Sequence, residues 1–280
     1  MKYQAENVVI IVIDGPRLSE TWEHPQKAHI PYLRDSLSPN ALIKTEFYNM
    51  GNTYTVPGHI SITTGSYEFK ENDGTQYPEN PSLFQSMLSC SGMASTNAYL
   101  VSAKGKLEVL GDCESIAFRN SFRPGMYTRS LNDKEVLRKA INVLETHQPR
   151  LLMVHFQSPD IRAHAKDWEG YIKAIEETDK LMFDLIRYLD ASVHYSDRTA
   201  VFMTNDHGRH LDGIKDGYVS HGDHCRGCTH INFMAYGPDF RSNTICDKSA
   251  ETIDILPTVG EILGFRSSWA SGRVMTEIFQ

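Results

Sequence analysis

Residues 7–15 read NVVIIVIDG, an unbroken run of mostly β-branched apolar side chains that ends in Asp-Gly. Such a run is typical of a strand that is buried on both faces of a parallel sheet. Three later segments repeat the pattern: RLLMVHFQ (150–157), TAVFMTND (199–206) and INFMAYG (231–237). Residues 7–14 are therefore predicted to form the first of at least four buried strands.

Segments of helical periodicity alternate with these strands. They are PSLFQSMLS (81–89), NDKEVLRKAINVLETH (132–147), WEGYIKAIEETDKLMFDLIRYL (168–189) and SAETIDILPTVGEILG (249–264). Asn132 is expected to cap the second of these helices and Gly264 to end the last. The alternation predicts an α/β fold with a mostly parallel central sheet and helices on both faces. Neither a repeat nor a linker divides the sequence, so we expect a single domain over residues 1–280.

The composition narrows the range of functions. Lys and Arg number 28 against 35 Asp and Glu, which gives a net charge of −7 and no basic footprint for nucleic acid. The first apolar run is too short to span a bilayer and lacks the pattern of a signal peptide. We therefore expect no membrane association and a cytoplasmic location, or a periplasmic or secreted one if a leader has been removed. The five cysteines, an odd number, do not form a disulfide framework.

Acidic side chains follow three of the predicted strands. Asp14 ends the first strand, Asp160 follows the second, and Asp206 ends the third. In open α/β sheets ligands bind beyond the carboxyl ends of the strands, so these carboxylates are expected to share one edge of the sheet. A single aspartate in this position is usually a turn residue, whereas three together indicate a site.

Histidines accompany these aspartates. His164 lies four residues after the second aspartate, a spacing that brings both side chains to one face of a helix, and His207 is adjacent to the third. The segment SHGDHC adds His221, with His224 as the alternative, whereas His155 lies inside a strand and is expected to be packed there. Carboxylate and imidazole are the expected ligands of zinc, or of manganese at a mixed site. The set is sufficient for two divalent metal ions and comprises Asp14, Asp160, His164, Asp206, His207 and His221.

The segment TYTVPGHISITTG (53–65) contains a candidate nucleophile. Thr55 would begin a helix with Pro57 in its first turn, a favoured position for proline. The free N–H groups and the dipole of a helix N-terminus suit an incoming phosphate. A threonine hydroxyl attacks at neutral pH only when a base or a metal activates it. Thr55 is therefore either a helix cap or a nucleophile, and Thr53 is the competing candidate.

Five blocks in order resemble the alkaline phosphatase superfamily, and within it the nucleotide pyrophosphatase/phosphodiesterase branch. The resemblance spans roughly residues 7–240. The blocks are IVIDG, TVPGH with TTG, PDIRAH, NDHG, and HG followed by MAYGPDF.

The resemblance implies a two-zinc site. Asp14, Asp206 and His207 would bind one ion, with the Thr55 oxygen beside it. The second ion would be bound by Asp160, His164 and a histidine from the HG block, which favours His221 over His224.

The resemblance also implies the reaction, a hydrolysis of phosphodiesters or phosphomonoesters by two in-line displacements through a phospho-threonine. Sulfatases of the superfamily carry a modified cysteine or serine in a Cys/Ser-x-Pro-x-Arg signature. The segment TVPGH has neither that residue nor the arginine, so sulfate esters are disfavoured as the main substrate.

Two further residues are candidates for binding the substrate, a small phosphate ester. The related phosphodiesterases place an asparagine downstream of the nucleophile, and Asn72 is the candidate here. Lys104, with Lys106 beside it, could supply the positive charge that a dianionic monoester needs.

Other interpretations stay open at this point. They are a phosphonate hydrolase, a cofactor-independent phosphoglycerate mutase or other hydrolase of the superfamily, and a metal-stabilised binding module without catalysis. The mutase normally has a large inserted domain and a serine nucleophile. This sequence has no room for the insertion and no obvious serine nucleophile. Cys225 and Cys228 could form a disulfide, a redox pair or part of a structural zinc site with His224 and His230, or could simply shape the loop.

Overall fold

A computed structural model of the chain describes residues 2–129 and 131–280. The strands are β1 (Asn7–Ile13), β2 (Ala41–Lys44), β3 (Phe47–Tyr48), β4 (Ala98–Ser102), β5 (Gly125–Tyr127), β6 (Leu151–Phe156), β7 (Thr199–Asn205), β8 (Phe233–Tyr236), β9 (Thr244–Cys246) and β10 (Ala250–Glu251). Eight of them form a sheet in the order β5-β4-β6-β1-β7-β8-β2-β9, and β10 pairs with β3. In the large sheet only β8 runs antiparallel to its neighbours.

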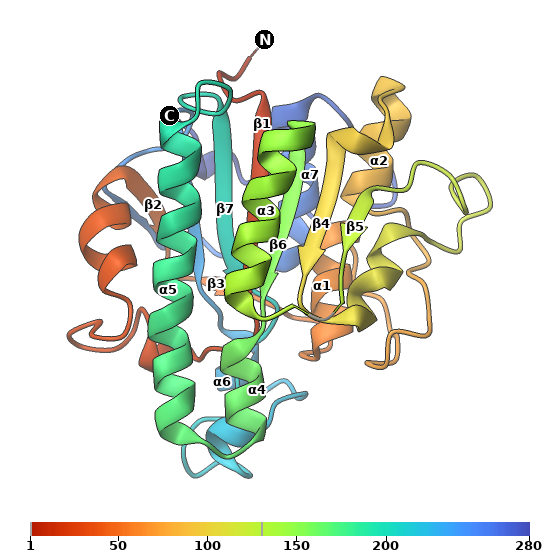
Figure 1. The fold of residues 1–280 in the computed structure, drawn as a ribbon. Helices are drawn as coiled ribbons and strands as arrows, with labels where there is room; N and C mark the ends of the chain where they lie inside the picture. The colour runs from red at the N-terminus through yellow and green to blue at the C-terminus, as the bar shows by residue number, and fades with distance from the viewer. Residues whose placement is uncertain (1, 130) are drawn as a thin grey trace.

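Helices cover both faces of this sheet (Figure 1). They are α1 (Thr55–Thr64), α2 (Leu83–Ser91), α3 (Asp133–His147), α4 (Ser158–His164), α5 (Trp168–Ala191), α6 (Arg226–Thr229) and α7 (Ile255–Leu263). Apolar residues of α1, α2 and α7 form one core with the sheet, and those of α3 and α5 form the other. The predicted α/β fold, mostly parallel with helices on both faces, is confirmed.

Sequence signals explain where several elements begin and end. Asn132 caps α3 in a capping box, in which its side chain accepts from the Glu135 N–H and Glu135 accepts from the Asn132 N–H. Gly264 ends α7 with a left-handed backbone, φ 81°. The helix predicted over 249–264 is shorter than expected, because β10 and a 3-10 turn precede α7.

One strand differs from the prediction in direction. The segment 231–237 has the apolar composition of a buried parallel strand, but β8 is antiparallel to both β7 and β2. Burial on both faces produces the same apolar run in either direction, so composition does not report orientation.

The central strand β1 places the site. It lies between β6 and β7 in parallel register, with Ile13 opposite both Phe156 and Asn205. The carboxyl ends of the three strands therefore reach the same level, at the end of the sheet where α4 and α6 lie in Figure 1. Among the described residues, no helix has the length and apolar character that crossing a membrane would require.

Candidate active site

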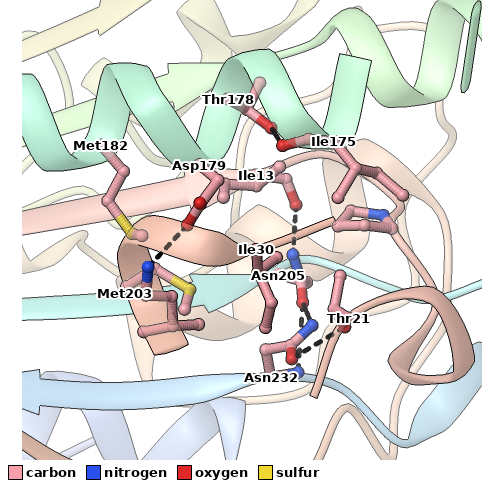
Figure 2. Close-up of a pocket in the computed structure, with 12 residues that line it drawn as sticks. Ile13, Thr21, Ile30, Ile175, Thr178, Asp179, Met182, Met203, Asn205 and Asn232 are labelled. Atoms are coloured by element: carbon pink, nitrogen blue, oxygen red, sulfur yellow. Dashed lines mark hydrogen bonds between the residues drawn. The ribbon is translucent and has the colours of Figure 1, made fainter. Parts of the chain in front are cut away.

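Two of the predicted aspartates follow neighbouring strands directly and are held together by the residues before them. Asn205, the last residue of β7, donates its side-chain N–H to the Ile13 carbonyl at 2.7 Å. Asn232 in turn donates to the Asn205 Oδ1 at 2.8 Å (Figure 2). This buried amide network fixes the two strand ends, so that the side chains of Asp14 and Asp206 leave the sheet next to each other.

Asp14, Asp206 and His207 form the first triad. All three are fully buried. His207 Nε2 lies 3.3 Å from Asp14 Oδ1 and 3.4 Å from Asp206 Oδ2. These same three atoms have no hydrogen-bond partner among the described residues. Buried polar atoms are nearly always hydrogen-bonded, so three unpartnered ligand atoms that face one another indicate a bound cation.

The spacing of the first triad fits a small tetrahedral ion. Ligand atoms at about 2.0–2.1 Å from such an ion lie about 3.3–3.4 Å from one another. The two measured separations, 3.3 and 3.4 Å, match this value. The three residues thus form a candidate metal-binding group, whose ligand atoms all lie within 4.8 Å of one another.

Asp160, His164 and His221 form the second triad. Asp160 Oδ1 lies 3.2 Å from His164 Nε2 and 3.5 Å from His221 Nε2, and the two imidazole nitrogens are 3.1 Å apart. Burial and the charge of His207 lower the pKa of His221 to about 4, so its ring is neutral, as a metal ligand must be. His224 is exposed instead. Of the two candidate histidines, the fold brings His221 to the triad.

Lys104 joins the two triads. Its ammonium donates to Asp14 Oδ2 at 2.6 Å and to Asp160 Oδ2 at 2.5 Å. Burial opposes its charge, but the two carboxylates outweigh that effect and raise the pKa of Lys104. In both Asp14 and Asp160, Oδ1 thus faces the triad and Oδ2 accepts from this lysine; Arg209 also donates to Asp160 Oδ1. The rings of His207 and His221 also stack across the two triads, with centroids 3.7 Å apart.

Thr55 is the first residue of α1 and is 1% exposed. The helix begins against the first triad, because a Cβ at Gly58 would lie 2.6 Å from the Asp206 carbonyl oxygen. His59, one turn along, lies with Nδ1 2.8 Å from the Thr55 carbonyl and 3.4 Å from Asp206 Oδ2. The close approach at Gly58 and the contact of His59 therefore place the first turn of α1, which begins at Thr55, against Asp206.

The competing threonine has a different environment. The Thr53 hydroxyl donates to the Asp223 carbonyl at 2.8 Å, and the Thr53 carbonyl lies 2.7 Å from His221 Nδ1. Thr53 therefore links the loop that carries His221 to the start of α1.

Asn72 reaches the same helix end from a distant loop. Its Oδ1 accepts from the Val56 N–H at 2.9 Å and from Lys106 Nζ at 3.0 Å. The capping residue Tyr54 makes no side-chain cap of its own. Asn72 thus takes over the cap and brings a side-chain amide and Lys106 next to Thr55.

Three residues of the site were not predicted from the sequence. His155 is a site residue rather than a packing residue, because its Nε2 lies 3.0 Å from Asp14 Oδ2 and its Nδ1 lies 2.9 Å from the Ser102 hydroxyl. Arg209, fully buried, donates to Asp160 Oδ1 and to the Gly15 carbonyl. His59 is the third. Arg209 follows NDHG by one residue and His59 follows Thr55 by one helical turn, which are the signals that could have located them.

A pocket of about 520 Å³ opens beside this constellation. Tyr54 and Gly222, neighbours in sequence of Thr55 and His221, belong to its wall. The pocket also holds Tyr67, Phe69 and Glu68, and Phe69 is 87% exposed. Its volume lies in the range of small-molecule sites, and its aromatic wall suits an apolar or planar group.

Comparisons with known proteins identify the family of the chain and its fold. The sequence profile of the sulfatase family matches residues 6–265. A 2,3-bisphosphoglycerate-independent phosphoglycerate mutase from Haloquadratum walsbyi (strain DSM 16790 / HBSQ001) is 28% identical over 134 residues, which are 48% of this chain and 25% of the mutase. The match therefore spans about a quarter of that relative's length.

Solved structures of three different activities share the fold. A 2-O GAG sulfatase superposes with a TM-score of 0.74 at 15% identity, over 97% of this chain and 73% of its own. Murine ectonucleotide pyrophosphatase / phosphodiesterase 5 gives 0.72 at 15% identity, over 98% and 100%. A phosphonate monoester hydrolase from Silicibacter pomeroyi gives 0.66 at 14% identity, over 96% and 76%. At these identities the likeness establishes the fold and leaves the substrate open.

Proposed function

The chain belongs to the sulfatase family of the alkaline phosphatase superfamily of hydrolases, and from this premise we propose that it hydrolyses phosphate esters with Thr55 as its nucleophile. The observation that carries the proposal is a threonine at the N-terminus of α1, set against a triad of unpartnered metal-ligand atoms. We further propose that residues 1–280 act as a single catalytic domain.

We propose two divalent cations in the site, zinc in the first place and manganese as the alternative. Asp14, Asp206, His207 and the Thr55 oxygen would hold one. Asp160, His164 and His221 would hold the other. When bound, such cations supply Lewis-acid stabilisation of phosphoryl oxygens and lower the pKa of a hydroxyl group that contacts them.

The residues of this chain then divide the remaining work. Thr55 gives its proton to solvent, its Oγ bonds to phosphorus as the bond between phosphorus and the ester oxygen breaks, and that oxygen leaves as an alcohol after taking a proton from water. A water molecule next bonds to phosphorus as the bond to Thr55 Oγ breaks, the hydroxyl of Thr55 is restored by a proton from that water, and the product is phosphate from a monoester or a phosphate monoester from a diester. The Asn72 side-chain amide and Lys106 offer donors to the phosphoryl oxygens, which carry most of the charge in such a step.

Threonine rather than cysteine or serine supports phosphate over sulfate esters as substrates. One of the structural neighbours, murine ectonucleotide pyrophosphatase / phosphodiesterase 5, has an inactive threonine-to-alanine variant in complex with AMP. In the present chain Lys106 adds positive charge that a dianionic phosphate needs, whereas Lys104 reaches the site but is paired with Asp14 and Asp160. The aromatic pocket beside Thr55 would accept the organic group of a small ester.

The test is a paired turnover assay on protein reconstituted with zinc or manganese. p-Nitrophenyl phosphate and bis-p-nitrophenyl phosphate report monoester and diester hydrolysis, and p-nitrophenyl sulfate is the matched sulfate ester. We expect turnover of at least one phosphate ester and far slower turnover of the sulfate. Sulfate turnover that exceeds both phosphate activities would overturn the proposal, and so would no turnover of any ester by metal-replete protein.

A further inference from the structure

A second group of ligand-type side chains lies outside the two triads. We call it the loop cluster, and it comprises His210, Asp223, Cys225 and Cys228. One ligand atom from each lies within 4.8 Å of the others. His210 comes from the segment after β7, Asp223 and Cys225 lie just before α6, and Cys228 lies in α6.

His210 is oriented as metal-ligating histidines are. The residue is 1% exposed, and its Nε2 has no hydrogen-bond partner among the described residues. That nitrogen faces the cluster, 3.2 Å from Asp223 Oδ2. The other ring nitrogen, Nδ1, lies 3.1 Å from Asp216 Oδ1 and 3.2 Å from the Ser220 hydroxyl. A carboxylate on the far nitrogen fixes the tautomer and leaves Nε2 free to bind a cation.

The remaining three ligands are brought together by α6 and the residues just before it. Cys225 caps this short helix, and the Cys228 N–H donates to the Cys225 carbonyl at 3.0 Å, so the Cys-x-x-Cys pair is wound into one turn. Both cysteines are free thiols. Asp223 Oδ1 accepts from the Cys225 N–H at 3.0 Å, and Oδ2 also binds the ammonium of Lys215, a side chain that is 60% exposed. A Cys-x-x-Cys pair with a histidine and one further ligand is the usual composition of a structural zinc site.

We propose that His210, Asp223, Cys225 and Cys228 bind a structural zinc ion, separate from the two triads. Four protein ligands close the coordination sphere, so the ion has a structural role and no open position for substrate. The site ties the segment after β7 to α6. It also fixes the backbone at Asp223, which accepts from the Thr53 hydroxyl at 2.8 Å, and Thr53 contacts His221. The ion would thus hold in place the loop that presents His221.

The primary test uses wild-type protein and does not depend on turnover. Zinc X-ray absorption on the purified protein should contain sulfur scattering at about 2.3 Å, because the two triads contain only nitrogen and oxygen ligands. Protein loaded with cobalt should show the near-ultraviolet band of thiolate coordination. An absorption spectrum without sulfur scattering would overturn the proposal. So would a non-reducing intact mass two hydrogens lower, with the bridge mapped to Cys225 and Cys228.

Variants assign the site to its ligands. Cys225→Ser combined with Cys228→Ser should lower the zinc content by one ion per chain and abolish the cobalt–thiolate band. Cys90→Ser is the matched control, because this thiol is exposed and outside the cluster. His207→Ala should remove metal from the first triad and leave the sulfur signal unchanged, which separates this site from the proposed function. If the double variant fails to fold, His210→Gln should still reduce the cobalt–thiolate band. A band that survives in both would overturn the assignment.

Discussion

Thr55 and Thr53 lie two residues apart and have different surroundings. The Thr53 hydroxyl is engaged by the Asp223 carbonyl, whereas Thr55 begins α1 beside the first triad. The difference comes from the helix start, since Thr55 is the first residue of α1 and Thr53 lies two residues before it.

Thr55→Ala should lower kcat at least about a thousand-fold, because a covalent nucleophile defines the step that it performs. The metal content and the circular dichroism spectrum should stay as in the wild type. Thr53→Ala loses one hydrogen bond and should cost no more than about ten-fold. Steady-state kinetics and mapping of a trapped phospho-enzyme check this. If the phosphate maps to Thr53 or to a serine, the assignment of Thr55 fails.

His207 and His155 both contact Asp14, at different oxygens. His207 Nε2 faces Oδ1 in the triad, and His155 Nε2 contacts Oδ2 behind it. His207→Ala should lose the ion of the first triad and nearly all activity. His155→Ala should cost about 10–100-fold, as is usual for a group that supports a metal ligand. Metal analysis alongside kcat distinguishes the two, and equal losses of metal would contradict this division.

At the scale of elements, single residues determine how the start of a helix packs against the end of a strand. Gly58 lets α1 approach Asp206, and Asn72 caps that helix from another loop. On the opposite face of the sheet, Asp179 of α5 accepts from the Tyr32 and Leu33 N–H groups at 2.8 and 3.0 Å. Its side chain lines a cavity of about 20 Å³ under the strand ends (Figure 2).

The Asp179 contact should make stability depend on pH. Burial raises the pKa of Asp179 to about 7, in spite of the two backbone donors. The folded state then binds a proton that the unfolded state has released, so this contribution is present at low pH and is lost as pH rises from about 4 to 7. The slope can reach about 1.4 kcal/mol per pH unit.

Denaturant unfolding at several pH values measures this slope. Asp179→Asn should remove the contribution and flatten the profile relative to the wild type in the same pH window. Asp184→Asn is a control on the same helix, since that carboxylate is paired with Lys180 at the surface. If the free energy of unfolding changes with pH by the same amount in the wild type and in Asp179→Asn over this window, the prediction is refuted.

At the scale of the whole molecule, the parallel sheet concentrates buried charge at one end. Asp14, Asp160 and Asp206 are at most 5% exposed, and they face one another across the carboxyl ends of the strands. Lys104 and Arg209 offset part of this charge. The unpartnered ligand atoms of the first triad indicate that a bound cation offsets the rest of this charge.

Removal of that cation should destabilise the entire fold. At a hundred-fold excess over Kd one bound ion contributes about 2.7 kcal/mol, which corresponds to about 5–10 °C in Tm for a chain of this size. We expect dipicolinate, which removes every bound ion, to lower Tm by at least this amount and to abolish turnover, and added zinc to restore both. Asp206→Asn, which should already lack the ion, provides the control with a smaller shift. An unchanged Tm after complete metal removal would contradict this.

The sequence alone determined the elements of the centre of the molecule. Long apolar runs and strongly periodic segments predicted β1, β6, β7, α3 and α5, because burial on both faces or on one face leaves a local pattern. The sequence also placed the aspartates at one edge of the sheet, because the carboxyl ends of parallel strands lie at the same edge. The short strands β2, β4, β5 and β9 were not predicted, because three to five residues carry too little periodicity.

Contacts between distant segments were decided by the tertiary structure. The resemblance favours His221 over His224, but the local pattern does not distinguish them, because both lie in one loop without periodicity and only the fold shows which ring turns inward. Lys104 and Asn72 were candidates, but the pairing of one with two carboxylates and of the other with the start of α1 required the folded loops. The role of His155 was missed because a histidine inside a strand has the same local pattern whether it packs or supports Asp14. A sequence records which side chains are buried, whereas which buried polar atoms meet depends on contacts between segments far apart in the chain.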